Sequence, residues 1–188
     1  MRAGWDVHFI DTDNYGLLDV RRVPHDLQFQ AIVLVGLYGT SITKFGNPYS
    51  WHFTGPPATI IEDAAQHWLA DSCQRIGLAS AISFDPMKNL SCYGNGGAVT
   101  SNDHDFICFA REWRDNGKPH HYSAGTNSRM SETDCAQMMV KTKYIDQWQA
   151  RRKQIASYWI ERLTGSSVHC LIDNTNIHTH AFHKFVVH

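Results

Sequence analysis

Short runs of apolar and β-branched residues recur through the first hundred positions, and each run ends at polar or turn-forming residues. The most continuous run, 31–36, predicts a strand buried on both faces, as the strands of parallel sheets are. Similar runs predict further strands at 58–63, 81–84 and 97–101. The pattern therefore predicts an α/β protein with a mostly parallel sheet.

Helical periodicity dominates the second half of the chain. Residues 104–113 predict a helix of about three turns. From 131 to 163, apolar residues recur every three or four positions with no proline among them, which predicts one helix of about 30 residues, bent near Asp146. Alternating patterns predict strands at 7–11 and 178–187, and the Gly- and Pro-rich stretch 40–57 is expected to be a loop.

Composition excludes several classes of protein. A chain of 188 residues, 43% hydrophobic and 19% charged, is expected to fold as about one globular domain. A net charge of -1 disfavours nucleic-acid binding, and the longest apolar run, 31–37, is too short to cross a membrane. The first residues lack the apolar core of a signal peptide. The five cysteines form no Cys-x-x-Cys pair, so a reducing cytoplasm is the expected location.

A carboxylate and a lysine follow neighbouring predicted strands. Asp63 ends the 58–63 run, and Lys88 lies just beyond the 81–84 run. Ligands of open α/β sheets bind at the carboxyl ends of the strands, so both side chains are expected in one crevice. Pyridoxal phosphate needs this pair, since a lysine amine forms its Schiff base and a carboxylate keeps its ring nitrogen protonated.

Each of these features also has a plainer interpretation. Lys88 taken alone could be a solvated surface lysine, and Asp63 could cap a helix, which is compatible with a cofactor role. The glycine-rich stretch 94–97 resembles a phosphate loop, but a hairpin turn is favoured.

Histidines are frequent, numbering twelve. Those near the C-terminus suggest zinc as a rival ligand, because three imidazoles can bind it. His178 and His180 would share one face of the predicted last strand, whereas His183 would lie on the other, and no carboxylate is spaced nearby. No metal site is therefore expected there, nor at His188.

Ordered motifs run through most of the chain. They are IIEDAAQ at 60–66, SF at 83–84, KNL at 88–90, GNGGA at 94–98, SND at 101–103, NSRMSE at 127–132 and YIDQW at 144–148. In this order and spacing they resemble the DegT/DnrJ/EryC1/StrS family of sugar aminotransferases, which have the aspartate-aminotransferase fold.

The resemblance implies a fold, an activity and a cofactor. Residues 1–145 would form part of a three-layer α/β/α large domain that binds pyridoxal 5'-phosphate. Residues 146–188 would form a long connecting helix and the first strand of an incomplete small domain. The implied enzyme moves an amino group, usually from glutamate, to a nucleotide-linked keto sugar in polysaccharide biosynthesis. Alternatives are a sugar dehydratase of the same family, in which histidine replaces the lysine, and a non-catalytic truncated remnant.

Roles carry over to residues that match the family's motifs. Lys88 would be the Schiff-base lysine and the catalytic proton shuttle. Asp63 would pair with the pyridinium nitrogen, Gln66 would lie beside the ring and its phenolic oxygen, and Ser83 would bind the cofactor phosphate.

A shared active site is also implied. Asn127 would reach the phosphate of the neighbouring subunit's cofactor, which implies a homodimer. Arg129, in the same loop, would help to bind the substrate or to order the loop.

The chain departs from the family in length and in one motif. Family members are about twice as long, so the chain is expected to be a fragment without the phosphate-cupping N-terminal turn and most of the small domain. The 188-residue chain is accordingly expected to bind the cofactor weakly and to turn over poorly. After Gln66 the family has a small residue and then His-Gly, whereas this chain has His67, Trp68 and Leu69.

Overall fold

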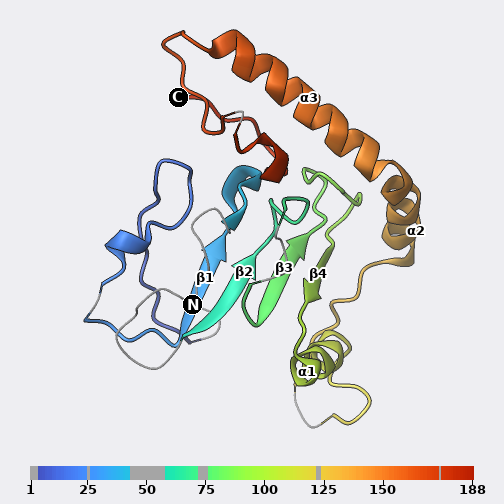
Figure 1. The fold of residues 1–188 in the computed structure, drawn as a ribbon. Helices are drawn as coiled ribbons and strands as arrows, with labels where there is room; N and C mark the ends of the chain where they lie inside the picture. The colour runs from blue at the N-terminus through green and yellow to red at the C-terminus, as the bar shows by residue number, and fades with distance from the viewer. Residues whose placement is uncertain (1–3, 25, 43–57, 72–75, 122–123, 174) are drawn as a thin grey trace.

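The computed structural model describes residues 4–24, 26–42, 58–71, 76–121, 124–173 and 175–188. Its sheet has four strands, β1 (Ala31–Val35), β2 (Thr59–Asp63), β3 (Ala79–Ser83) and β4 (Gly97–Thr100), hydrogen-bonded in that order (Figure 1). The first three strands are parallel and β4 is antiparallel to β3. The predicted α/β class and mostly parallel sheet are therefore confirmed.

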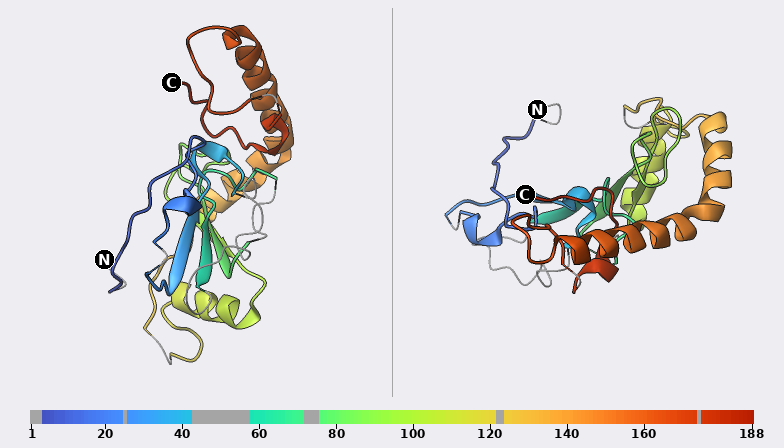
Figure 2. Two further views of the ribbon diagram at one scale, coloured as in Figure 1. Left: turned by 60° about the vertical axis from the view of Figure 1, so that its left-hand side comes forward. Right: turned by 90° about the horizontal axis from the view of Figure 1, so that it is seen from above.

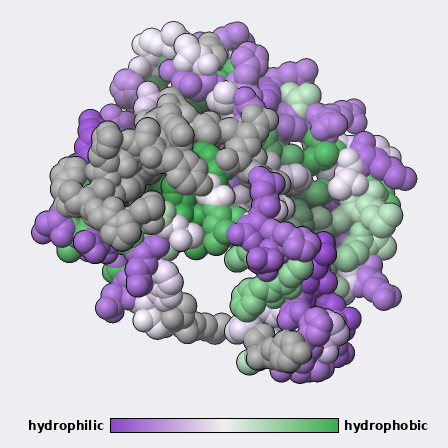
Figure 3. Space-filling view, turned by 60° about the horizontal axis from the view of Figure 1, so that its bottom comes forward, coloured by the Kyte–Doolittle hydropathy of each residue, from purple (hydrophilic) through white to green (hydrophobic). Residues whose placement is uncertain are grey.

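The strand register assigns side chains to the two faces of the sheet. One row across the strands, Val35, Asp63, Ala81 and Val99, lies on the more open face, where half of the Val99 side chain is exposed. The next row, Leu34, Glu62, Ser80 and Thr100, lies on the opposite face. There the main core packs, comprising Leu17, Ile32, Leu34, Ile42, Ile60 and Ile76. Some apolar residues reach the surface of the molecule, where they are drawn in green in Figure 3.

The long predicted helix is two helices. Helix α2 (Glu132–Lys141) is followed by a 3-10 turn, Thr142–Tyr144, and then by α3 (Ile145–Leu163). The hydroxyl of Thr142 donates to the carbonyl of Met139 at 2.9 Å, a side-chain bond that bends helices. The expected bend therefore exists, but it lies just before Asp146 and interrupts the helix.

Helix α1 (His104–Arg114) confirms the helix predicted at 104–113. Its N-cap is Asp103, whose carboxylate accepts the N–H of Phe106 at 2.8 Å. Helix α1 lies beyond the end of the sheet where β4 finishes, and α3 lies beyond the opposite end, near the carboxyl ends of β1 to β3 (Figures 1 and 2).

Two predicted strands are wrong. Residues 7–11 form no strand, and 82% of Phe9 is exposed, because no described strand lies beside them. After the 3-10 helix Ile177–Thr179, residues 178–187 form no continuous strand, and among the described residues Val187 makes only an isolated antiparallel β-bridge with Cys170. In the middle of this stretch the backbone bonds another loop, since the N–H of Ala181 donates to Gly39 O at 2.8 Å. At its end the backbone pairs with residues 169–171, since the N–H of Leu171 donates to Val186 O at 3.0 Å. Of the predicted loop 40–57, residues 43–57 lie outside the described residues.

The C-terminal segment packs on α3 and contacts the turn that follows β1. Ala156 and Ile160 of α3 form a second core with Ile172, Ile177 and Phe182. The buried His180 bonds within this segment, because its Nδ1 accepts the N–H of Phe182 at 2.9 Å. Within the described parts of the chain, no group of three histidine, cysteine or acidic side chains could hold a metal ion.

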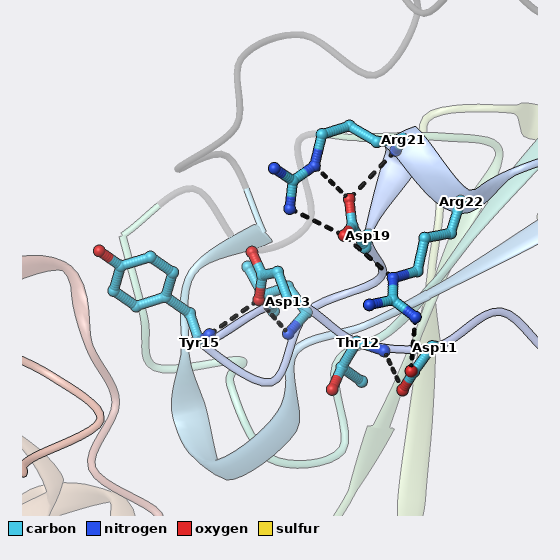
Figure 4. Close-up of polar contacts among 8 residues, drawn as sticks. Asp11, Thr12, Asp13, Tyr15, Asp19, Arg21 and Arg22 are labelled. Atoms are coloured by element: carbon cyan, nitrogen blue, oxygen red, sulfur yellow. Dashed lines mark hydrogen bonds and ion pairs between the residues drawn. The ribbon is translucent and has the colours of Figure 1, made fainter.

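Carboxylates organise the segment that precedes β1 (Figure 4). Asp13 accepts the amides of Tyr15 and Leu17 at 2.8 and 3.0 Å. Asp19 accepts two bonds from the Arg21 guanidinium, both at 2.8 Å, and this contact holds the pKa of Asp19 down at about 2. Arg22 reaches Asp11 at 2.9 Å. These bonds order a stretch that has little regular structure of its own.

None of the described helices is both long enough and apolar enough to cross a membrane.

Candidate active site

The candidate residues of β2 and β3 meet at one edge of the sheet. Asp63 is the last residue of β2 and Ser83 the last of β3, and the two strands are parallel. Beyond the strands, the rings of Trp68 and Phe84 meet edge-to-face at 6.0 Å, so the two following segments are in contact. The edge expected from the sequence is thus formed, whereas the placing of Asp63 and Lys88 around a ring-sized gap stays a prediction.

Asp63 caps the turn that follows its strand. Its Oδ1 accepts the N–H of Ala65 at 3.0 Å, which is the capping role considered from the sequence, here in a turn rather than a helix. No described residue donates to Oδ2 of Asp63. One carboxylate oxygen at the more open face is therefore left for a ligand.

Gln66 has a fixed amide orientation. Its Oε1 accepts the backbone N–H of Tyr38 at 2.8 Å. Because a backbone N–H can only donate, the side-chain oxygen must face Tyr38 and the NH₂ group must face the other way. That NH₂ group donates to no described residue, so it can donate to an oxygen of a ligand.

Lys88 lies in the connection from β3 to β4. The backbone N–H of Lys88 donates to the carbonyl of Asp85 at 2.9 Å, and the backbone N–H of Asp85 donates to the Ser83 hydroxyl at 3.3 Å. The lysine is half-buried, and among the described residues its amine has neither a hydrogen bond nor an ion pair. The hairpin turn favoured at 94–97 is not formed, because residues 94–96 are only the end of a longer connection, 84–96, and Gly97 begins β4.

The residue after Lys88 anchors the connection to the C-terminal segment. Asn89 donates to Ala181 O at 2.7 Å, and its Oδ1 lies 3.3 Å from His183 Nδ1. Burial, with the positive charges of Lys88, Lys184 and Arg152, lowers the pKa of His183. His183 therefore contacts the residue that follows Lys88, and the sequence had indicated it only as a metal ligand.

Helix α2 holds the later part of the same connection. The carboxylate of Asp134 accepts the amides of Tyr93 and Gly94 at 3.0 and 3.1 Å. The pKa of Asp134 is lowered mainly by the hydrogen bond from the Ser131 hydroxyl and further by these two amide bonds. Lys141 donates to Ser91 O at 2.6 Å. These contacts join residues far apart in the sequence, and no motif identified them.

Asn127 and Arg129 are not brought to this edge. Both are exposed, and both lie beside Asp115 at the end of α1, Asn127 through a β-bridge and Arg129 through an ion pair of 3.5 Å. Helix α1 lies beyond the opposite end of the sheet from Ser83 and Asp63 (Figure 1). Within one chain, Asn127 is therefore remote from Lys88.

A buried polar group beneath the edge was also not predicted. Glu62 and His67 have no solvent-exposed surface, and His67 Nε2 lies 2.8 Å from Glu62 Oε1. The only signal in the sequence was that His67 occupies a position where a small residue was expected.

The residues present fit pyridoxal phosphate. The Lys88 amine, one oxygen of Asp63 and the NH₂ group of Gln66 have no partners among the described residues. All three follow the carboxyl ends of β2 and β3. The three groups are thus available to a ligand in one region, and they are a cation, a carboxylate oxygen and an amide donor.

The sheet and this edge are those of the pyridoxal-phosphate-dependent aminotransferase fold. A DegT/DnrJ/EryC1/StrS aminotransferase from Brucella abortus matches at 26% identity with a TM-score of 0.78, over 95% of this chain and 52% of that one. Streptomyces venezuelae DesV, solved with a ketimine intermediate, matches at 26% identity with a TM-score of 0.77, over 95% of this chain and 50% of that one.

The chain belongs to the DegT/DnrJ/EryC1/StrS aminotransferase family, whose model matches residues 1–188. It is 33% identical over 170 residues to a dTDP-3-amino-3,6-dideoxy-alpha-D-galactopyranose transaminase of Aneurinibacillus thermoaerophilus, a match over 84% of this chain and 45% of that protein. It is 38% identical over 113 residues to a dTDP-3-amino-3,4,6-trideoxy-alpha-D-glucose transaminase of S. venezuelae, a match over 56% of this chain and 30% of that protein. The chain thus spans half or less of the length of these relatives.

Proposed function

We propose that residues 1–188 carry the cofactor-binding edge of an aminotransferase. The enzyme moves an amino group from an amino-acid donor, for which glutamate is the first candidate, to a nucleotide-linked keto sugar. One observation carries the proposal: a half-buried lysine with an unengaged amine follows the strand next to the one that Asp63 ends. The names of the relatives, which are nucleotide-sugar transaminases, support the substrate class.

The side chains have separable tasks in this proposal. Pyridoxal phosphate, when bound, supplies an electron-accepting ring that allows an amino group to leave one carbon and join another. The Lys88 amine would hold the cofactor and move the proton at Nζ. Asp63 would keep the ring nitrogen protonated, Gln66 would donate to the phenolic oxygen, and the Ser83 hydroxyl would donate to the phosphate.

The lysine favours amino transfer over the dehydratase alternative. In the dehydratase branch, as the family resemblance implies, a histidine stands at the position of Lys88. This chain has lysine there, and His183 comes from the C-terminal segment rather than from the motif that carries Lys88.

The proposal is tested by trapping the lysine. The 188-residue chain is mixed with pyridoxal phosphate, reduced with borohydride and digested, and the adduct is mapped by mass spectrometry. We expect one adduct per chain, on Lys88, and its loss in Lys88→Arg. Lys184→Arg is the matched control and should keep the adduct, because Lys184 lies in the same region but has no assigned role. Adducts spread over surface lysines would contradict the proposal.

The exposed position of Asn127 favours a homodimer with shared sites. An isologous dimer could bring Asn127 of one chain to the Lys88 edge of the other. The division into a large-domain part, 1–145, and a small-domain part, 146–188, belongs to the same proposal, as does a cytoplasmic location.

Subunit mixing tests the shared site. Lys88→Ala and Asn127→Asp chains should each bind the cofactor poorly, since each pure dimer lacks one half of every site. After unfolding and refolding together in equal amounts, about a quarter of the sites should regain wild-type affinity, because half of the dimers are mixed and each has one intact site. No recovery on mixing, or a monomer in sedimentation, would contradict the dimer.

A further inference from the structure

A chain of buried polar side chains runs beneath the candidate site. The hydroxyl of Ser80, on β3, donates to Glu62 Oε2, and His67 Nε2 donates to Glu62 Oε1 at 2.8 Å. Glu62 and His67 are fully buried and Ser80 is 3% exposed. An ionised carboxylate can be buried only with such donors around it.

Gly36 provides the space for the imidazole. A Cβ at this position would lie 1.7 Å from His67 Nδ1 and 2.1 Å from its Cγ, so the ring occupies the place of a side chain at the end of β1. The N–H of Gly36 in turn donates to the carbonyl of Asp63 at 3.2 Å. The ring is therefore fitted between the ends of β1 and β2.

The Glu62–His67 bond closes a loop around the candidate residues. Asp63 and Gln66 lie between Glu62 and His67 in the sequence, and the hydrogen bond between Glu62 and His67 joins the two ends of this turn. Glu62 lies on the core face of β2 and Asp63 on the more open face. The loop thus passes around the sheet edge, with its anchor on the core face and its carboxylate on the more open one.

We propose that His67 is a positioning residue that holds Asp63 and Gln66 in place for the cofactor through its buried bond to Glu62. The proposal rests on the proposed function for the identity of the ligand. It also accounts for this chain's departure from the small residue expected after Gln66. The bond uses Nε2, the outer ring nitrogen, so a glutamine can replace the histidine as donor whereas the shorter asparagine cannot reach Glu62.

Two variants of similar polarity test this role. We expect His67→Asn to raise the dissociation constant for pyridoxal phosphate about tenfold, the usual effect of one lost buried hydrogen bond. His67→Gln should stay within about threefold of the wild type. Ile32→Val, in the core of the same face but without polar contacts, is the control for lost stability and should leave the dissociation constant unchanged.

Hydrogen exchange gives a readout that needs no cofactor. The backbone N–H of Ala65 bonds Asp63, and that of Tyr38 bonds Gln66. Both amides should exchange at least about tenfold faster in His67→Asn than in His67→Gln, after correction for any change in exchange of the β3 amides. If His67→Asn does not fold, Ser80→Ala should show the same change in smaller degree. Equal local exchange in all variants would overturn the positioning role, whatever the cofactor does. A wild type with no adduct on Lys88 would overturn the proposed function alone.

Discussion

Asparagine in place of Asp63 should weaken the binding of pyridoxal phosphate roughly 10- to 150-fold, because one charge-assisted hydrogen bond of about 1.5–3 kcal/mol is lost. Asparagine is nearly isosteric and can still accept the N–H of Ala65, which Asp63 Oδ1 accepts at 3.0 Å, so the turn should be retained. What it lacks is the negative charge that would keep the ring nitrogen protonated. In a single turnover with saturating cofactor and glutamate, the amino-transfer rate should fall by about 10²–10³.

Two controls separate this effect from a structural one. Asp103→Asn removes a carboxylate at the start of α1, far from the site, and asparagine remains a good helix cap, so affinity should not change. Borohydride should still trap Lys88 in Asp63→Asn, since the amine does not depend on the carboxylate for its chemistry. An unchanged affinity and rate would remove Asp63 from the site, and with it the proposed pairing to the ring nitrogen.

The sheet could be predicted from the sequence because its strands are short, apolar and bounded by polar residues. The run at 31–36 yields β1 within one residue, and the run at 58–63 ends with β2 at Asp63, whereas β3 covers Ala79–Ser83 rather than the predicted 81–84. Strand identity in a parallel sheet depends mostly on burial, which a single sequence records well.

The predicted strands at 7–11 and 178–187 were wrong because alternation predicts a strand only if a neighbour is available to pair with it. Phe9 has no such neighbour among the described residues. In the C-terminal segment, Phe182 adopts a φ of 45°, outside the β region, while the flanking amides bond the Tyr38–Gly39 turn. Both outcomes depend on tertiary contacts that local pattern does not contain.

The candidate site divides in the same way. Asp63, Gln66, Ser83 and Lys88 could be named as candidates because they lie within motifs beside strand ends. The partners that hold them could not, because each contact joins distant elements: Asn89 with Ala181, and Gly94 with Asp134. The Glu62–His67 bond is local in sequence, but its need for a glycine at position 36 becomes visible only when β1 and β2 are aligned.

Alanine at position 36, directly after β1, should destabilise the fold strongly. Gly36 has φ -83°, a value that alanine adopts readily, so no backbone strain is introduced and the whole effect is the clash. The new methyl group would lie 1.7 Å from His67 Nδ1 and must displace a fully buried ring. Overpacking costs about 1–3 kcal/mol and the loss of one donor to a buried carboxylate about as much again, so we expect a loss of roughly 2–6 kcal/mol.

Chemical denaturation of a double-mutant cycle decides whether the clash is the cause. In a His67→Ala background the ring is absent, so adding Gly36→Ala should cost less than about 1 kcal/mol, and the two changes should be strongly non-additive. Gly165→Ala is the reference for backbone strain alone, since Gly165 has φ +82° with open space around its Cβ position, and it should cost about 1–2 kcal/mol. If Gly36→Ala were equally destabilising with and without the His67 ring, the ring would not occupy the space above Gly36. The loop that presents Asp63 and Gln66 would then be held by other contacts.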